Sequence, residues 1–175
     1  MNIFYLDHDV QKCAEMHCDK HVVKMILEYA QLLCTAHHAK DTYICQEEFE
    51  IKRVNEDKLG MLYKSTHLMH PSSVWARESL QHYNWLYRLF AALCDEYTHR
   101  YGKVHKTDSK LRELLSVPPS RLEDNGWKQP TQAMPMVYKK QDSVEAYRHY
   151  YCRDKLRNIQ VRYTKREKPN WLVKK

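Results

Sequence analysis

The stretch "HPSSVWARESLQHYNWLYRLFAALCDEYTHRYGK", residues 70–103, holds the clearest secondary-structure signal of the chain and decides its fold class. Pro71 favours the first turn of a helix, and Gly102 is typical of the residue that follows a helix end. Between them, apolar side chains recur at helical spacing and predict one buried stripe: Trp75, Leu86, Phe90, Leu93 and Tyr97. A helix of about 28 residues, at about 1.5 Å per residue, is about 42 Å long and can organise a whole domain.

Two further helices are predicted, one on each side of this stretch. The first runs from about Val10 to about His37, with Asp7 or Asp9 as its N-cap. Its core face is formed by Cys18, Val22, Ile26, Tyr29 and Leu33. The second is capped at residues 142–143 and turns these side chains inward: Val144, Tyr147, Tyr151 and Leu156.

The remaining segments predict the connections between these helices. Residues 2–6, "NIFYL", predict a short strand or an extended arm, and residues 38–64 predict a weak helix or an insertion. Residues 116–141 carry four prolines and predict a long loop, a kind of segment that is often functional. Residues 158–175 predict a basic tail. We therefore expect one mainly α domain over residues 1–175, a compact bundle of three main helices with a short N-terminal extended arm, a long Pro-rich loop and a basic C-terminal tail.

The composition is that of an ordinary folded protein. The 175 residues are 43% hydrophobic and 29% charged, and no apolar stretch approaches the length of a membrane span. The first residues show no basic leader and no apolar signal segment, so we expect no signal peptide. The six cysteines form no Cys-x-x-Cys pair, and a chain of this size needs no disulfide staples. We therefore expect reduced thiols, a cytoplasmic location and no membrane partner.

Positive charge is concentrated at the C-terminal end of the chain. Residues 1–147 contain 19 Lys and Arg against 20 Asp and Glu, whereas residues 148–175 contain 10 against 2. Aromatic residues are interleaved with these cations, and little of the charge lies where a core would need it. This pattern suits phosphates and unpaired bases, whereas the alternative is a solvated tail that only aids solubility. The predicted contacts to nucleic acid are Arg148, Arg153, Arg162, Lys165, Arg166 and Trp171.

The start of the first predicted helix gathers reactive side chains. Cys13, His17 and His21 stand four residues apart, a spacing with which one helix can offer ligands to a transition metal. His17 and His21 also continue into a polar stripe with Lys24 and Glu28, which suits acid–base or anion-binding chemistry. The third interpretation is structural, with both imidazoles hydrogen-bonded at the helix end.

A second candidate group lies on the long helix. Ser79 and His82 fall within its apolar stripe, where a buried hydroxyl and a buried imidazole need partners. They either pair with each other across one turn or form the floor of a pocket with Trp75 as a stacking wall. Arg77, Asn84 and Arg88 lie on the opposite side of the helix, and surface solvation is their default interpretation.

Four blocks cover most of the chain and carry a resemblance. They are "FYLDHDVQKCAEMHCDKHVVKMILEYAQLL" (4–33), "HPSSVWARESLQHYNWLYRLFAALCDEYTHRYGKVHKT" (70–107), "QAMP" (132–135) and "DSVEAYRHYY" (142–151). These blocks resemble a family of small proteins from tailed phages and some bacteria. No established activity comes with this resemblance.

The order of parts carries a second, remote resemblance. An N-terminal arm, a first helix with His, a long second helix after His70-Pro71, and a third helix leading into an aromatic basic tail are similar to the pyrimidine-dimer DNA glycosylases of the endonuclease V type. The resemblance implies DNA contact and an amine nucleophile, the α-amino group of residue 2, assisted by a Glu. This chain has Asn2 at the first place and Lys24 near the second. The carboxylates nearest to that place are Glu15, Asp19 and Glu28.

We therefore predict a phage-type protein that acts on nucleic acid, with DNA favoured, as a glycosylase- or lyase-like base-excising enzyme or as a DNA-modifying enzyme. Lys24 is predicted as an anion clamp or amine nucleophile, and no cofactor is expected unless a metal binds at His17 and His21. The predicted catalytic residues are His17, Asp19, His21, Lys24, Ser79 and His82. One alternative is a non-catalytic accessory or anti-defence protein that binds a nucleotide or a host protein. The other is a small metalloenzyme.

Overall fold

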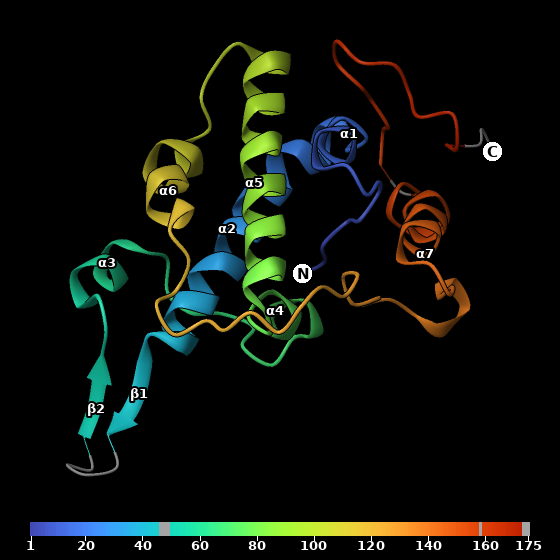
Figure 1. Ribbon diagram of the computed structural model, residues 1–175. Helices are drawn as coiled ribbons and strands as arrows, with labels where there is room; N and C mark the ends of the chain where they lie inside the picture. Colours follow the sequence, from blue (N-terminus) through green and yellow to red (C-terminus); the bar gives the residue numbers. More distant parts are fainter. Residues whose placement is uncertain (46–49, 158, 173–175) are drawn as a thin grey trace.

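The computed structural model describes residues 1–45, 50–157 and 159–172. It is mainly helical, with 54% helix and 4% strand, which confirms the predicted mainly α fold class. Helices α2 and α5 pack against each other at the centre of the molecule, and the other elements surround this pair (Figure 1). No helix within these described ranges is long and apolar enough to cross a membrane.

The long stretch that decides the fold forms two helices rather than one. Helix α4 covers Pro71–Ala76, and α5 covers Leu80–Tyr101. The predicted continuous helix is wrong because Ser79 is extended, with φ −149° and ψ 147°, and its hydroxyl caps α5 by accepting from the Gln81 N–H. The predicted end is correct, since Gly102 has φ 65° and closes α5 in the left-handed conformation.

The first predicted helix is also divided. Helix α1 covers Val10–Glu15 and α2 covers Asp19–Lys40, so the chain leaves the helical conformation at residues 16–18. Cys18 is extended there, and its N–H donates to the Tyr151 hydroxyl at 3.0 Å. A partner far along the sequence therefore replaces a local helical bond. Asp9 caps α1 by accepting from the Lys12 N–H, as predicted.

The N-terminal arm is extended and belongs to the core. Residues 3–6 are all buried, although they pair with no strand among the described residues. The Phe4 N–H donates to the Tyr29 hydroxyl of α2, and the Tyr5 ring meets Trp85 of α5 edge to face. The arm thus fills the space between α2, α5 and α7, and its rings contact His21, Trp85 and Tyr147 on these helices.

The segment between α2 and α4 is a hairpin followed by a short helix. Strand β1 (Thr42–Cys45) pairs antiparallel with β2 (Glu50–Arg53), and α3 covers Glu56–Met61. The predicted weak helix or insertion at 38–64 is therefore the end of α2, this hairpin and α3. Residues 46–49 lie outside the described part. Helix α6 follows α5 and covers Lys106–Ser116.

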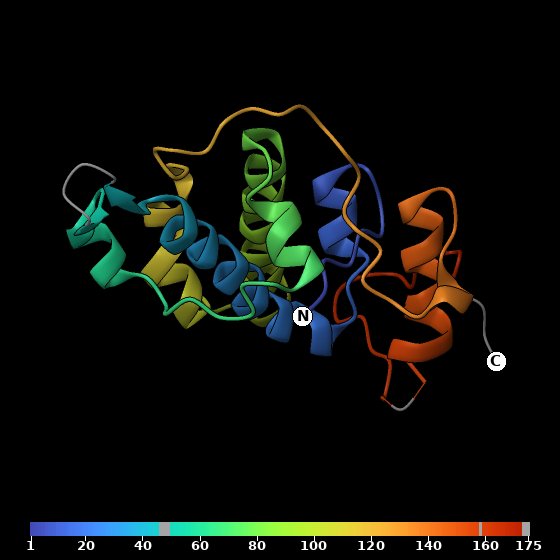
Figure 2. The same cartoon turned by 90° about the horizontal axis from the view of Figure 1, so that it is seen from below.

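The C-terminal third begins with the predicted long loop. Residues 116–141 contain one 3-10 turn, η1 (Met136–Tyr138), and the loop runs past α5 and α4 to α7 (Figure 2). Helix α7 covers Ser143–Tyr150 and continues as the π-helical turn η2 (Tyr151–Lys155). Asp142 caps α7 as predicted. All four predicted inward-facing side chains are buried: Val144, Tyr147, Tyr151 and Leu156.

Candidate functional site

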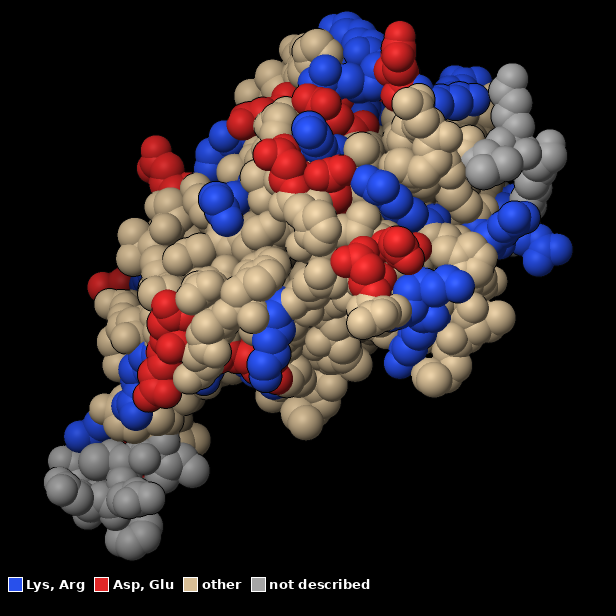
Figure 3. Space-filling model, turned by 45° about the vertical axis from the view of Figure 1, so that its right-hand side comes forward, with Lys and Arg blue, Asp and Glu red and all other residues tan. Residues whose placement is uncertain are grey.

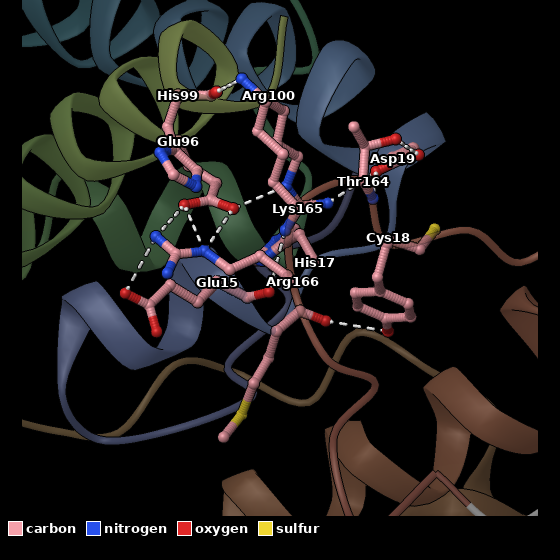
Figure 4. A network of polar contacts seen from close by, with 12 residues as sticks. Glu15, His17, Cys18, Asp19, Glu96, His99, Arg100, Thr164, Lys165 and Arg166 are labelled. Carbon is pink, nitrogen blue, oxygen red and sulfur yellow. Dashed lines mark hydrogen bonds and ion pairs between the residues drawn. The ribbon is translucent and has the colours of Figure 1, made fainter.

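The tail residue Arg166 belongs to a polar network that joins three parts of the chain (Figure 4). The fully buried Glu96 carboxylate of α5 accepts from Arg100 Nε at 2.6 Å and from Arg166 Nη2 at 2.8 Å. Burial acts to raise the pKa of Glu96, but the hydrogen bonds from Arg166 and Arg100 outweigh it and lower the pKa. Asp19 accepts from Arg100 and, through both oxygens, from Thr164. Asp19 and Arg166 therefore hold the tail against α2 and α5.

Two other predicted contacts to nucleic acid hold the N-terminal arm. Arg148 Nε donates to the Leu6 carbonyl at 2.7 Å, and its Nη2 donates to Asp7 at 3.0 Å. Trp171 is half-buried, and its indole N–H points at the Met16 sulfur at 3.4 Å. The Arg148 guanidinium lies over the Trp171 ring, 5.4 Å from its centroid. These side chains pack the C-terminal part onto the arm and α1.

The remaining predicted tail contacts differ in whether the side chain has a partner within the protein. Lys165 Nζ donates to the His99 carbonyl near the end of α5, at 2.8 Å. Arg153 and Arg162 are exposed, and neither side chain has a partner within the described part of the chain. The expectation that the tail charge lies free of internal contacts is therefore correct for Arg153 and Arg162, and it is wrong for Arg148, Lys165 and Arg166.

The predicted metal ligands have other partners. The Cys13 thiol donates to the Phe4 carbonyl at 3.2 Å. His17 is fully buried, with Nδ1 at 2.7 Å from the Cys13 carbonyl and Nε2 at 2.9 Å from the Tyr29 hydroxyl. Burial lowers the pKa of His17 to about 3, so the ring is neutral. The described residues contain no group of three His, Cys, Asp or Glu side chains that could hold a metal ion.

His21 marks the beginning of a polar surface on α2. Its Nδ1 lies 2.7 Å from the Tyr151 hydroxyl, which already accepts from the Cys18 N–H. The hydroxyl hydrogen is thus available to His21 Nδ1, and this arrangement leaves Nε2 to carry the imidazole proton. Burial, followed by the charges of Lys24 and Lys155, lowers the pKa of His21 to about 4. His21 is therefore a neutral hydrogen-bonding group.

Glu28 lies one turn beyond Lys24 and connects α2 with the start of α4. The Lys24 ammonium is 3.2 Å from the Glu28 carboxylate, and the lysine side chain is 68% exposed. The pKa of His70 is lowered by burial, then by the amino group of Met1 and by His67, whereas Glu28 acts to raise it. The charges of three groups, the amino group of Met1, His67 and Glu28, therefore act on the His70 ring. We call His21, Lys24, Glu28, His70 and the amino group of Met1 the α2 polar face.

Ser79 and His82 do not bond to each other, so that prediction is wrong. The Ser79 hydroxyl donates to Asp124 at 3.1 Å. His82 Nδ1 lies 2.9 Å from the Trp75 carbonyl, and His82 Nε2 accepts from the Lys128 N–H at 2.9 Å. Both side chains therefore fix the loop at residues 124–128 to the α4–α5 junction. Trp75 is only 2% exposed and stacks on His82, so it cannot be an open stacking wall.

A surface pocket of about 570 Å³ lies in front of this buried layer. We call it the aromatic pocket. Its aromatic surfaces come from the arm, from α5 and from the loop, and its polar groups come mainly from successive turns of α5. The lining residues are Tyr5, His8, Gln81, Asn84, Trp85, Arg88 and Trp127.

The sequence singled out the buried residues behind this pocket, Trp75 and His82, but not the residues that line it. Asn84 and Arg88 were expected to be solvated surface, because a single helix shows no partner for its outer face. Trp127 lies in the Pro-rich loop and follows Gly126, which has φ 79°. An aromatic residue at a glycine turn of a long loop was the available signal.

Comparisons with protein-family models, with curated proteins and with solved structures found no match to this chain. The chemistry of the α2 polar face and of the aromatic pocket is thus the basis for a functional proposal.

Proposed function

We propose that the protein acts on nucleic acid as a base-excising enzyme of the glycosylase or lyase type, with the α2 polar face as its reaction centre. The observation that carries this proposal is Glu28, whose carboxylate lies 3.2 Å from the amine of Lys24. A second amine, the amino group of Met1, acts on the pKa of His70, as Glu28 does. An amine next to a general acid–base group is the arrangement that nucleophilic attack on a sugar carbon needs.

The proposed reaction uses each of these groups. Glu28 takes a proton from the ammonium, and the amine nitrogen then forms a bond to C1′ of the deoxyribose while the bond from C1′ to the base breaks. The electron pair of that bond leaves with the base, which takes up a proton. The attached nitrogen then loses a proton, the bond from C1′ to the ring oxygen breaks, and that oxygen takes up a proton, which leaves an imine between the nitrogen and C1′. Glu28 exchanges these protons, and the neutral His21 donates a hydrogen bond from Nε2 to a phosphate or sugar oxygen.

Surface charge supports contact with DNA by a distributed set of cations. Exposed cations without an acidic partner in the described residues include Arg153, Arg157 and Arg162. Figure 3 shows basic side chains interspersed with acidic ones over one face, rather than a continuous basic band. Phosphate contacts of this kind position a strand without reading its sequence.

The other parts of the proposal, a phage-type protein and a DNA substrate, follow from the two resemblances. A phage-type protein with a cytoplasmic location fits the five cysteines whose side chains are described, since none of them forms a disulfide. DNA is favoured over RNA because the second resemblance is to DNA glycosylases. Within the described residues no cluster favours the metalloenzyme alternative.

Borohydride trapping tests this function directly. The full chain is incubated with DNA that carries an abasic site, a deaminated base or a pyrimidine dimer, and the imine is reduced to a stable covalent adduct. We expect an adduct with at least one of these substrates, and peptide mapping by mass spectrometry identifies Lys24 or the Met1 amino group. Lys20→Ala is the matched control for Lys24→Ala, because Lys20 is an exposed lysine of the same helix. Absence of an adduct on all three substrates overturns the proposal.

A further inference from the structure

The aromatic pocket has the size and lining of a small-ligand site. Its volume of about 570 Å³ falls within the usual range for such sites, about 300–1,000 Å³. Tyr5, Trp85 and Trp127 form a continuous group of rings, with centroids 5.0 Å apart for Tyr5 and Trp85 and 6.0 Å apart for Trp85 and Trp127. Trp127 remains 41% exposed, so one part of this group stays open to a ligand.

The loop that carries Trp127 is fixed in place. The Leu80 N–H donates to the Glu123 carbonyl at 2.9 Å, and Asn125 Nδ2 donates to the Glu78 carbonyl at 2.7 Å. On the other side of Trp127, the Lys128 carbonyl accepts from the buried Trp75 indole at 3.0 Å. The Trp127 ring is thus held before any ligand arrives, and little side-chain entropy is lost on binding.

The polar side of the pocket lies on α5. Within the described residues, the side chains of Asn84 and Arg88 have no hydrogen-bond or ion-pair partner. Gln81 donates to Asp124 through Nε2 at 3.2 Å, which leaves its carbonyl oxygen as an acceptor. These residues stand three and four apart, so they lie on one face of the helix. The pocket therefore offers an open amide, an acceptor and a guanidinium beside a set of rings.

We propose that the aromatic pocket binds one nucleotide, either free or as an unpaired unit of a strand. The base stacks on Trp127, Asn84 bonds to the edge of the base, and Arg88 holds the phosphate. Rings that stack on any base, an amide that matches a base edge and a guanidinium that matches phosphate are the three parts of nucleotide recognition. This site is separate from the α2 polar face, so it stands even if base excision does not.

Isothermal titration calorimetry on the full chain tests the proposal. The probes are deoxyadenosine monophosphate and thymidine monophosphate, deoxyadenosine without phosphate, a short single-stranded oligonucleotide, and a blunt duplex of the same sequence. We expect saturable binding of the mononucleotides, of the oligonucleotide or of both, and weaker binding of deoxyadenosine and of the duplex. Binding of the mononucleotides identifies a free ligand, whereas binding of the oligonucleotide alone identifies a strand.

Two variants locate the binding in the pocket. Trp127→Ala should weaken it about 5- to 100-fold, the range expected for one base stacked on an aromatic ring. Arg88→Ala should weaken nucleotide binding about tenfold and abolish the preference over deoxyadenosine, since one charge-assisted bond is lost. Arg53→Ala removes the same charge from an exposed position on β2, outside the pocket, and should leave affinity unchanged. No binding of any mononucleotide or single strand, or equal affinity in all three variants, overturns the proposal.

Discussion

Glu28 is the residue on which the proposed chemistry depends most. We predict that Glu28→Gln lowers the rate of borohydride-trappable adduct formation by about 10²- to 10⁴-fold, the usual contribution of a general acid–base group. Fold stability should change by no more than about 1 kcal/mol, because the Lys24 partner is 68% exposed and Gln has nearly the same shape as Glu. Adduct formation is followed by denaturing gels, and stability by urea unfolding. Glu113→Gln, an exposed carboxylate on α6, is the control. An unchanged rate in Glu28→Gln would remove the carboxylate from the mechanism.

Arg166 is a second single residue with a large expected effect, in this case on the free energy of unfolding. We predict that Arg166→Ala lowers the free energy of unfolding by about 2–4 kcal/mol at pH 7, because Glu96 then keeps only Arg100 as a partner. The pKa of Glu96 is below its ordinary value of 4.5 in the folded state. Its stabilising contribution is therefore complete above that ordinary value and is lost as the pH falls through the folded-state pKa.

Urea unfolding at pH 7 and below pH 4 measures this effect. The difference between the natural chain and Arg166→Ala should be largest at pH 7 and should shrink as the carboxyl group takes up a proton. Arg162→Ala should stay within about 0.5 kcal/mol at both pH values, as an exposed side chain without a partner. A stability difference that grows on acidification would show that Arg166 acts through another group.

At the scale of the elements, the junction between α4 and α5 supports a distant loop through the side chain of Ser79. We predict that Ser79→Ala lowers the free energy of unfolding by about 1–2 kcal/mol, because α5 loses its N-cap. The Asn125 N–H also loses its acceptor, the Ser79 hydroxyl at 3.1 Å. Amide hydrogen exchange should therefore quicken across residues 123–128. Ser116→Ala, at an exposed hydroxyl of α6, should change neither quantity, and unaltered exchange in Ser79→Ala would contradict this role.

Helices and their caps were predictable wherever the residues that determine them lie close together in the sequence. Leu86, Phe90 and Leu93 are buried as their spacing predicts, and Asp9 and Asp142 cap the helices they precede. The breaks before α2 and α5 were not predictable in this way. Tyr151 accepts from the Cys18 N–H across 133 positions, and Glu123 accepts from the Leu80 N–H. These acceptors compete with local helical bonds, and no window of the sequence contains both members of either pair.

The candidate sites also differ in whether their residues lie close together in the sequence. The stripe of His21, Lys24 and Glu28 follows from helical spacing alone, and the structure places all three on or beside one surface of α2. His17 leaves that stripe because it lies in the interruption between α1 and α2, at residues 16–18. The aromatic pocket combines the arm, α5 and the Pro-rich loop, so its lining becomes visible only when the chain is folded.

At the scale of the whole molecule, the tail binds inward and leaves few cations for a ligand. We predict that the double variant Arg153→Ala and Arg162→Ala lowers the salt dependence of binding to duplex DNA. The log–log slope should fall in magnitude by about 1.8 if each arginine contacts one phosphate of the duplex. Unfolding free energy should remain within about 0.5 kcal/mol. Fluorescence anisotropy at several salt concentrations measures the slope. An unchanged slope would place the phosphate contacts on another surface.

The contacts between the two ends of the chain determine when folding can finish. Arg148 holds Leu6 and Asp7, and Arg166 reaches Glu15 and the buried Glu96, so α1 and the arm depend on partners made about 140 residues later. During synthesis on a ribosome, α2, α5 and α6 are complete while those partners have not yet been translated. The arm of the nascent chain then lacks the cover that Tyr147 and Tyr151 give to Phe4, until the last segment emerges. Such dependence on distant contacts slows folding and makes the unfinished chain a substrate for chaperones.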